Sequence, residues 1–371
     1  MKNRFIPVSQ PFLSKLELEY SIDAIKSGFI SGTTGKYIIK FENAFAKFCQ
    51  TKEGVACNSG TAALQLAVRA INIKKGDEVI VPAFTNIASI LCIIYVGGTP
   101  VLVDSRKDTW CMDEEQVEER VTKKTKAILP VHIYGHPVKM DKIIAIADEY
   151  ELKVIEDAAE AHGAEYENRP VGGIGDIGCF SFYANKIITT GEGGMVVTNN
   201  KRFAEKMRSM RNLSFGDVKR YLHKDLGYNF RMTNVQAAMG VAQMERVEEL
   251  IERKITIASL YTKYLKNVNG LTLPVEMPWA KNVYWMYGIV LDKRYELTKE
   301  ELMQALYKRG IETRSFFVPM EKQPALRPLF EGERYGVAEK ISRNGLYLPS
   351  GMGLKREQIE YVCNAIRELS G

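Results

Sequence analysis

The feature that most constrains the fold is an alternation of strand and helix patterns near the middle of the chain. Residues 126–134 form an apolar run typical of a buried strand, and residues 153–156 form a second one. Residues 140–150, between them, have the spacing of an amphipathic helix, whose apolar side is made of Ile143, Ile144, Ile146 and Ala147. A strand, a helix and a strand in this order predict two parallel strands joined by a right-handed crossover. Asp157 then lies at the carboxyl end of its strand, the edge where open α/β sheets bind their ligands.

Other segments extend this unit into a larger domain. Residues 77–82 and 194–198 predict further strands of the same sheet. From about Met244 a long amphipathic helix leads out of this region, and it is expected to bridge two domains. We therefore predict a large domain over residues 1–249, which includes an N-terminal arm, and a smaller one over residues 250–371.

The pattern after the long helix is typical of a small α+β domain. Thr298 and Glu301 form a capping box that opens a helix, and Gly310 closes it. A strand is expected over residues 311–317 and a last helix over residues 356–369. The predicted fold class is α/β, with a mainly parallel sheet in the large domain and a smaller C-terminal α+β domain.

Size and charge exclude several classes of protein. With 371 residues, of which 46% are hydrophobic and 26% charged, the chain has the composition of a soluble globular protein with more than one core. Its formal net charge of +6 suits an anionic ligand such as a nucleotide, but the basic residues are scattered, so nucleic acid is not expected as a partner. The N-terminus lacks the apolar core of a signal peptide, and no apolar run reaches the ~18 residues of a membrane span. We expect a cytoplasmic protein without a membrane partner.

Cysteine and histidine usage argues against a metal site. Cys-x-x-Cys spacing is absent, which indicates reduced thiols and no zinc ribbon, and the chain has only four histidines. The six cysteines are Cys49, Cys57, Cys92, Cys111, Cys179 and Cys363.

A lysine and an aspartate carry the strongest chemical signal. Lys186 stands between a strand-like stretch and the glycine-rich turn of residues 191–194. A lysine paired with an aspartate is the protein half of a pyridoxal-phosphate site, in which Lys186 would hold the cofactor covalently and move protons, and Asp157 would pair with the pyridine nitrogen. Lys186 needs a lowered pKa for this role, which apolar surroundings provide. Its expected neighbours are Phe180, Phe182, Tyr183 and Ile187.

A third element would bind the cofactor phosphate. Ser59, Gly60, Thr61 and Ala62 stand where a short strand gives way to a helix, so their backbone N–H groups point at whatever lies over the helix start. The same residues could instead form an ordinary N-cap. Ser181 is a further candidate phosphate ligand. Glu160 would lie beside the cofactor ring or act as a first-turn acid of a helix.

Four motifs in a fixed order resemble a known family. They span residues 58–64, 156–163, 181–186 and 227–238, and together they resemble the sugar-nucleotide aminotransferases (DegT/DnrJ type) of the aspartate-aminotransferase fold. The resemblance implies pyridoxal-phosphate fold type I and transfer of an amino group from L-glutamate to a nucleotide-linked keto sugar. It also implies a homodimer with active sites at the interface, where Asn229 or Arg231 reaches the neighbour's phosphate.

The substrate expectation also depends on the resemblance. Residues 131–137, 186–195 and 310–314 are most similar to the family members that form GDP-perosamine, which implies GDP-4-keto-6-deoxy-D-mannose as acceptor and a role in O-antigen or surface-polysaccharide biosynthesis. The alternatives are amino transfer to a UDP- or dTDP-linked 3-keto or 4-keto sugar, and a non-catalytic regulatory relative. Candidate substrate-binding residues are Arg220, His223 and Arg314 for a diphosphate and Glu321 for a sugar hydroxyl.

The sequence departs from the family at two positions. Asn86 stands where the family usually has an aromatic residue stacked on the cofactor ring, and Asn86 is retained as a candidate cofactor ligand. In an extended segment residues 84 and 86 point to the same side, so Phe84 is either a substitute for the stacked ring or a core residue. Glu321 stands at a position that is commonly histidine.

Overall fold

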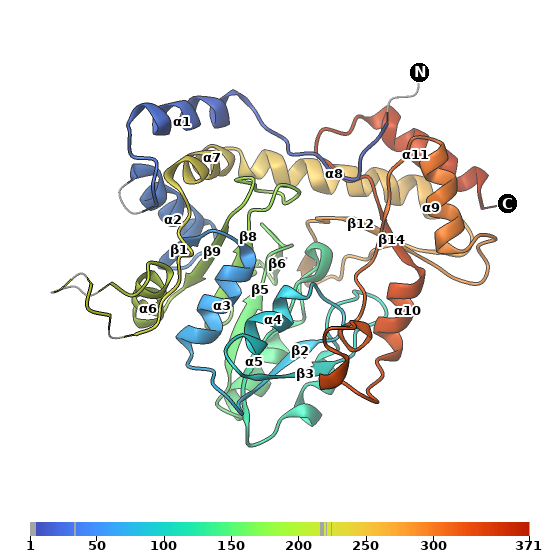
Figure 1. The fold of residues 1–371 in the computed structure, drawn as a ribbon. Coiled ribbons are helices and arrows are strands. Elements are labelled where there is room, and N and C mark those ends of the chain that lie inside the picture. Colours follow the sequence, from blue (N-terminus) through green and yellow to red (C-terminus); the bar gives the residue numbers. More distant parts are fainter. Residues whose placement is uncertain (1–4, 33–34, 216–218, 220, 224, 371) are drawn as a thin grey trace.

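The large sheet has seven strands and is mainly parallel. The computed structural model describes residues 5–32, 35–215, 219, 221–223 and 225–370. The strand order is β1-β9-β8-β5-β4-β2-β3, and only β9 runs against its neighbours (Figure 1). The bounds are β1 Glu53–Cys57, β2 Glu78–Pro82, β3 Thr99–Val103, β4 Thr125–Ile128, β5 Lys153–Asp157, β8 Ile177–Ser181 and β9 Gly194–Thr198. The predicted α/β class and mainly parallel sheet are confirmed.

The predicted strand-helix-strand unit is present, with one strand shorter than expected. It consists of β4, the helix α5 Met140–Glu149 and β5. The strand expected over residues 126–134 ends at Ile128, because Pro130 has no N–H for a sheet ladder and Tyr134 has a φ of 53°, which a strand does not accommodate. The rest of that run crosses the sheet edge beside Asp157, where the N–H of His132 donates to the Asp157 carbonyl.

Several helices cover the sheet and bury an apolar side against it. On α2, for example, Phe41 and Phe45 are one turn apart and fully buried. Helices α3 and α4 lie in front of the sheet in the view of Figure 1. The helices of this part are α1 Lys15–Lys26, α2 Lys36–Phe48, α3 Gly60–Ala70, α4 Ala88–Ile94, α6 Lys201–Arg211 and α7 Asn234–Met244.

A long helix, α8 Val247–Leu265, contributes to two hydrophobic cores. Its first turns place Leu250 and Ile251 in the core of the large sheet, whereas Ile257 and Tyr261 belong to a second core. The domain boundary between residues 249 and 250 stays a prediction. Within the described ranges, no helix combines the length and apolar character needed to cross a membrane.

The second core lies under a four-stranded antiparallel sheet with the order β10-β12-β14-β13. The predicted capping box is present, with Thr298 as the N-cap of α9, but the strand expected over residues 311–317 pairs only at Arg314 and Ser315. The elements are β10 Leu271–Thr272, β12 Tyr287–Leu291, α9 Lys299–Lys308, β13 Arg314–Ser315, α10 Gly336–Asn344, β14 Gly345–Leu348 and α11 Arg356–Glu368. A third, small sheet comprises β6 Glu165–Tyr166, β7 Arg169–Pro170 and β11 Ala280–Lys281.

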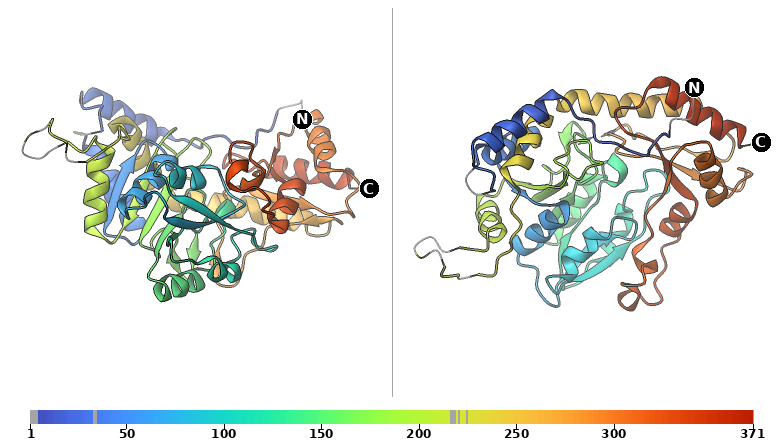
Figure 2. Two further views of the ribbon diagram at one scale, coloured as in Figure 1. Left: turned by 60° about the horizontal axis from the view of Figure 1, so that its bottom comes forward. Right: turned by 45° about the horizontal axis from the view of Figure 1, so that its top comes forward.

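An N-terminal strap, residues 5–14, connects the two ends of the molecule (Figures 1 and 2). At the four-stranded sheet, Ile6 pairs with Ile311 and the N–H of Val8 donates to Glu312 Oε2 over 2.8 Å. Farther along, the ring of Phe12 lies 4.6 Å from the guanidinium carbon of Arg253 on α8. The strap then enters α1, which packs against α7.

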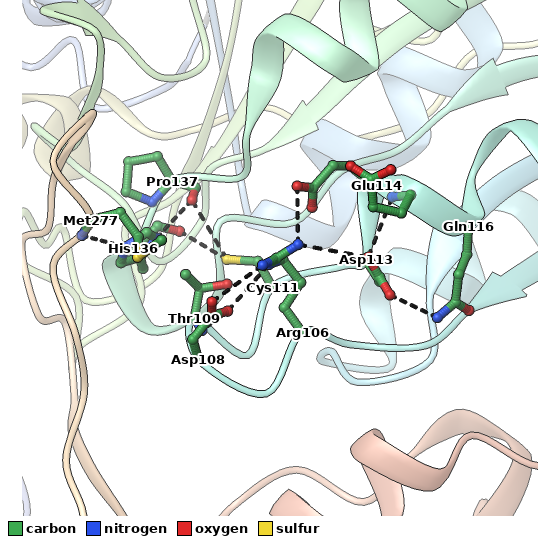
Figure 3. Close-up of polar contacts among 11 residues, drawn as sticks. Arg106, Asp108, Thr109, Cys111, Asp113, Glu114, Gln116, His136, Pro137 and Met277 are labelled. Carbon is green, nitrogen blue, oxygen red and sulfur yellow. Dashed lines mark hydrogen bonds and ion pairs between the residues drawn. The ribbon is translucent and has the colours of Figure 1, made fainter.

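The loop after β3 is closed by ion pairs (Figure 3). The guanidinium of Arg106 lies 3.2 Å from Asp108 and 3.3 Å from Glu114. The Cys111 thiol donates to the carbonyl of His136, and burial raises its pKa to about 12. Like Cys111, the other five cysteines are buried and unpaired.

Candidate active site

A cavity of about 300 Å³ lies where the carboxyl ends of β1, β8, β5 and β2 reach the same edge of the sheet. Eight of the predicted site residues line it: Ser59, Gly60, Thr61, Asn86, Asp157, Glu160, Ser181 and Lys186. Parallel strands explain this gathering, because their carboxyl ends share one edge although the residues are far apart in sequence.

Asp157 is the last residue of β5, and its carboxylate is buried. Ser89 Oγ donates to Oδ2 over 2.7 Å, and the N–H of Ala159 donates to Oδ1 over 3.2 Å. Burial raises the pKa of Asp157, whereas the hydrogen bond from Ser89 opposes this rise. The hydroxyls of Ser89 and Thr85 are 2.9 Å apart, so Asp157 is held by a short polar chain.

Lys186 is buried, with its amine directed over an aromatic ring. Nζ lies 3.6 Å from the centre of the Trp285 ring. Burial lowers the pKa of Lys186, and the carboxylates of Glu160 and Asp157 oppose that shift. Of the expected apolar neighbours, Phe180, Phe182 and Ile187 belong to the core, but Tyr183 is 48% exposed.

Glu160 lies in a turn, so the interpretation as a first-turn acid of a helix is wrong. Its Oε2 accepts the N–H of Tyr134 over 2.8 Å. Burial raises the pKa of Glu160 to about 7, although Lys186 opposes the rise. The cavity therefore contains an amine with a lowered pKa that interacts with two carboxyl groups whose pKa values are raised.

The turn after β1 presents backbone donors to the cavity. Ser59 is the N-cap of α3, and its Oγ accepts the N–H of Ala62 over 3.1 Å. The N–H of Ala62 is thus paired within the turn, and Ala62 does not line the cavity, so its role as a cofactor ligand stays a prediction. Gly60 and Thr61 line the cavity, and N–H groups in the first turn of a helix are suited to binding an anion.

Two glycines allow this close approach of strand ends. A Cβ added to Gly60 would lie 2.7 Å from Ser181 Cβ, and one added to Gly194 would lie 2.2 Å from the carbonyl oxygen of Ser59. Both distances are shorter than van der Waals contact, so a side chain at either position would push the turn away from β8 and β9.

These residues fit pyridoxal phosphate. They offer a buried amine, a buried carboxylate for the ring nitrogen, and a helix N-terminus with Ser and Thr hydroxyls for a phosphate dianion. The cavity also contains an orphaned polar atom: among the described residues, the buried Oδ1 of Asn185 has no hydrogen-bond partner. A polar group of a bound ligand would supply the missing partner.

Phe84 points into the core and Asn86 lies at the cavity, so the expectation that both side chains point to the same side of an extended segment is wrong. The chain bends over residues 83–85 instead of staying extended. The ring of Phe84 is buried against Tyr134 and Phe316, at centroid distances of 6.0 and 5.9 Å, which supports its interpretation as a core residue. Asn86 is exposed at the cavity, where its Oδ1 accepts the N–H of Ala88.

The residues expected to serve a neighbouring subunit lie outside this cavity. Arg231 donates to Asn212 Oδ1 over 2.9 Å and lines a separate cavity of about 520 Å³ beside Lys36 and Arg208. Asn229 is exposed on the same segment.

The predicted substrate-binding residues that the structure describes do not line the cavity either. His223 is exposed, with Nδ1 at 2.8 Å from the carbonyl of Leu213, and Arg220 lies outside the described residues. Arg314 is exposed on β13, in register with Tyr347, which does line the cavity. Glu321 is buried, and neither of its oxygens has a hydrogen-bond partner among the described residues.

Three aromatic residues of the cavity, Trp285, Phe317 and Tyr347, were not predicted. They come from the segments around the four-stranded sheet. The indole N–H of Trp285 donates to the carbonyl of Asn185 over 2.8 Å, across 100 positions of sequence. The spacing of residues within a motif does not predict contacts between residues so far apart in the sequence.

Comparisons with known proteins agree with this geometry. Residues 12–367 match the DegT/DnrJ/EryC1/StrS aminotransferase family. GDP-perosamine synthase of Escherichia coli O157:H7 is 42% identical over 366 residues, covering 98% of each chain. dTDP-3-amino-3,4,6-trideoxy-alpha-D-glucose transaminase of Streptomyces venezuelae is 38% identical over 347 residues, covering 90% of this chain and 89% of that one.

Solved structures of sugar aminotransferases are similar to this chain over nearly its whole length. DesV of S. venezuelae is 35% identical, with a TM-score of 0.90 over 98% of this chain and 99% of that chain. A putative sugar aminotransferase from Streptococcus pneumoniae in its PLP form is 27% identical, with a TM-score of 0.93 over 99% of each chain. The fold is that of the type I pyridoxal-phosphate enzymes.

Proposed function

This chain belongs to the DegT/DnrJ/EryC1/StrS aminotransferase family, and on that premise we propose that it transfers an amino group to C4 of GDP-4-keto-6-deoxy-D-mannose. It is a pyridoxal-phosphate-dependent sugar aminotransferase. The product would be GDP-perosamine, a precursor for O-antigen or another surface polysaccharide. L-Glutamate as the amino donor and a cytoplasmic location stay predictions from the sequence.

The roles of the cavity residues follow from their positions. Pyridoxal phosphate supplies the electron-accepting ring that carries the amino group between donor and acceptor. We propose that Nζ of Lys186 binds the cofactor covalently and then takes and returns the proton at the carbon that gains or loses the amino group. The lowered pKa of Lys186 suits this role, because only a neutral amine accepts a proton.

Two further groups would orient the cofactor. Asp157 would hold a proton on the ring nitrogen, a charge-assisted hydrogen bond that the contacts from Ser89 and Ala159 align. Gly60, Thr61 and Ser181 would bind the phosphate through backbone N–H and hydroxyl groups. Glu160 would lie beside the ring, on the same side of the cavity as Tyr134.

One observation carries the choice of sugar. The identity to GDP-perosamine synthase of Escherichia coli O157:H7 is 42% over 98% of both chains. The resemblance of the runs 131–137, 186–195 and 310–314 favours the same sugar. A dTDP-linked 3-keto sugar is the second candidate, because the S. venezuelae transaminase is 38% identical over about nine tenths of each chain. Arg314 and His223 stay candidate diphosphate ligands, and Glu321 stays a candidate for a sugar hydroxyl.

We also propose a homodimer. The outer side of α1 exposes Leu18, Ile22 and Ile25, spaced by four and three residues, whereas Glu17 and Ala24 on its inner side are buried. Phe29, after α1, and Ile39, on α2, are also exposed. Patches of this kind mark protein interfaces, and a second copy of the chain would cover it while bringing Asn229 and Arg231 to a neighbouring cavity.

The test is a substrate screen on the purified enzyme. GDP-, dTDP- and UDP-linked keto sugars are each incubated with L-glutamate, and the amino sugar is identified by mass and by the position of the new amine. The expected product is the 4-amino GDP sugar. Exclusive use of a dTDP-linked sugar would select the second candidate, and turnover of free amino and keto acids alone would exclude both.

The assignment of Lys186 has its own test. Borohydride reduction of the enzyme with bound cofactor, followed by peptide mapping, should place the adduct on Lys186. An adduct on another lysine would contradict the assignment.

A further inference from the structure

A second buried lysine, Lys254, contacts the backbone of Trp285, one of the residues that line the cavity. Lys254, on α8, is 4% exposed, and its Nζ donates to the carbonyl oxygens of Trp285 and Ser350, each over 2.6 Å. Burial alone lowers the pKa of Lys254 to about 7, and within the described residues no carboxylate pairs with it. Burying an amine costs free energy that an apolar side chain of the same length would not cost. The lysine therefore needs an explanation beyond packing.

The two carbonyls belong to adjacent strand ends. Trp285 lies two residues before β12, and Ser350 lies two residues after β14, the partner of β12. Ser350 also accepts the N–H of Tyr287 through its Oγ and donates its own N–H to Val8 of the N-terminal strap. Lys254 thus fixes the backbone of Trp285 relative to three elements: α8, the four-stranded sheet and the strap.

The side chain of Trp285 faces the reactive lysine. Its ring centre lies 3.6 Å from Lys186 Nζ, and its indole N–H donates to the carbonyl of Asn185, the residue before Lys186. The face of an indole stabilises a positive charge within about 6 Å of the ring centre. Two hydrogen bonds therefore fix Trp285: its carbonyl accepts from Lys254, and its indole N–H donates to Asn185.

We propose that Lys254 is a positioning residue that holds the indole of Trp285 over Lys186, and that the indole favours the protonated form of the Lys186 nitrogen. This inference rests on the proposed role of Lys186 as the cofactor-binding residue. In this proposal Lys254 contacts neither substrate nor cofactor, and it influences the protonation of Lys186 only through Trp285.

The first experiment is Lys254→Met in the holoenzyme. The absorbance of the bound cofactor, titrated with pH, reports the protonation of the nitrogen that links it to Lys186. We expect the titration midpoint to move to lower pH by roughly 0.5 unit, the size that the loss of one cation–π contact gives. We also expect kcat to fall by about fivefold, with KM for the sugar nucleotide unchanged.

The matched control is Tyr261→Phe. Tyr261 is also buried on α8, and its hydroxyl donates to the carbonyl of Pro349, so the variant removes a hydrogen bond to the same turn without touching Trp285. It should leave the titration midpoint in place. If neither variant moves the midpoint, Lys254 is merely structural and the proposal fails, whatever either variant does to the unfolding temperature.

A double-mutant cycle separates a direct effect from one through Trp285. In a Trp285→Leu background, Lys254→Met should move the midpoint no further. Equal shifts with and without the indole would overturn the proposal. Lys254→Gln, which keeps a hydrogen-bond donor, replaces Lys254→Met if that variant does not fold, with the same expected direction.

The outcome also distinguishes this inference from the proposed function. A reduced adduct on a lysine other than Lys186 overturns both. An adduct on Lys186 together with an unmoved midpoint in Lys254→Met overturns the positioning role alone.

Discussion

The carboxylate of Asp157 is the residue on which the proposed chemistry depends most directly. Asp157→Asn should bind the cofactor but turn over roughly 100-fold more slowly, because an amide cannot hold a proton on the ring nitrogen. Turnover is measured as kcat, and folding is checked by the unfolding temperature. The control is Asp148→Asn, which changes an exposed aspartate on α5. Near-normal turnover in a folded Asp157→Asn enzyme would contradict the assignment.

Glu321 makes stability depend on pH. Burial raises its pKa from 4.5 to about 7, Asp104 and Glu339 add to the rise, and Lys322 opposes it. Between these two values the folded protein binds more protons than the unfolded chain, so this residue makes stability fall as pH rises.

Glu321→Gln removes this dependence. The variant should match the wild type near pH 5 and unfold about 2 °C or more above it at pH 8. Thermal unfolding at both pH values measures the difference, and Glu331→Gln, at an exposed position in the same segment, is the control. A constant difference between the two pH values would show that Glu321 does not titrate in this range.

At the scale of elements, the start of α3 tests whether the turn at Ser59 binds the cofactor phosphate. In Gly194→Ala the new Cβ would meet the Ser59 carbonyl, so the turn must move away from β9. We expect affinity for pyridoxal phosphate to fall roughly tenfold or more, since such a shift costs about 1–3 kcal/mol. The affinity is measured by titrating the apoenzyme with cofactor.

The control for that experiment is Gly336→Ala. Gly336 begins α10, and nothing lies within 4 Å of an added Cβ. It should leave cofactor affinity unchanged. Equal affinity in Gly194→Ala and Gly336→Ala would mean that the turn does not contact the phosphate.

Sequence patterns within short segments correctly predicted the helices and strands that depend mainly on contacts between residues close in the sequence. The unit β4-α5-β5 and the capping box of α9 follow from periodicity and side-chain chemistry within about a dozen residues. The strand expected over residues 311–317 is short because pairing depends on β14, which is distant in sequence. For the same reason the sequence predicted Lys186 and Asp157 as a pair but not Trp285, whose place over Lys186 depends on packing between two sheets.

At the scale of the whole molecule, the exposed side of α1 predicts how copies associate. Ile25 is 58% exposed on that side. Ile25→Glu should shift the protein toward monomers, because a buried unpaired carboxylate would destabilise the interface. Light scattering after size-exclusion chromatography measures the mass. Leu329→Glu changes a residue of similar exposure at a different surface and should leave the mass unchanged.

Shared active sites would follow from such a dimer. Lys186→Ala and Arg231→Ala chains, each inactive alone, should recover part of the activity when they are mixed and allowed to exchange. Verified heterodimers without activity would favour self-contained sites.

The N-terminal strap has a consequence for the order of biosynthesis. Val8 and its partner Glu312 are 304 residues apart, so a ribosome releases one long before the other exists. The seven strands of the large sheet are complete once Thr198 has emerged, and domains generally fold as units during translation. The strap must therefore wait, undocked, while the sheet forms, and closing so long a loop carries a large entropic cost. Docking of the first residues made is thus expected to be the closing event of folding.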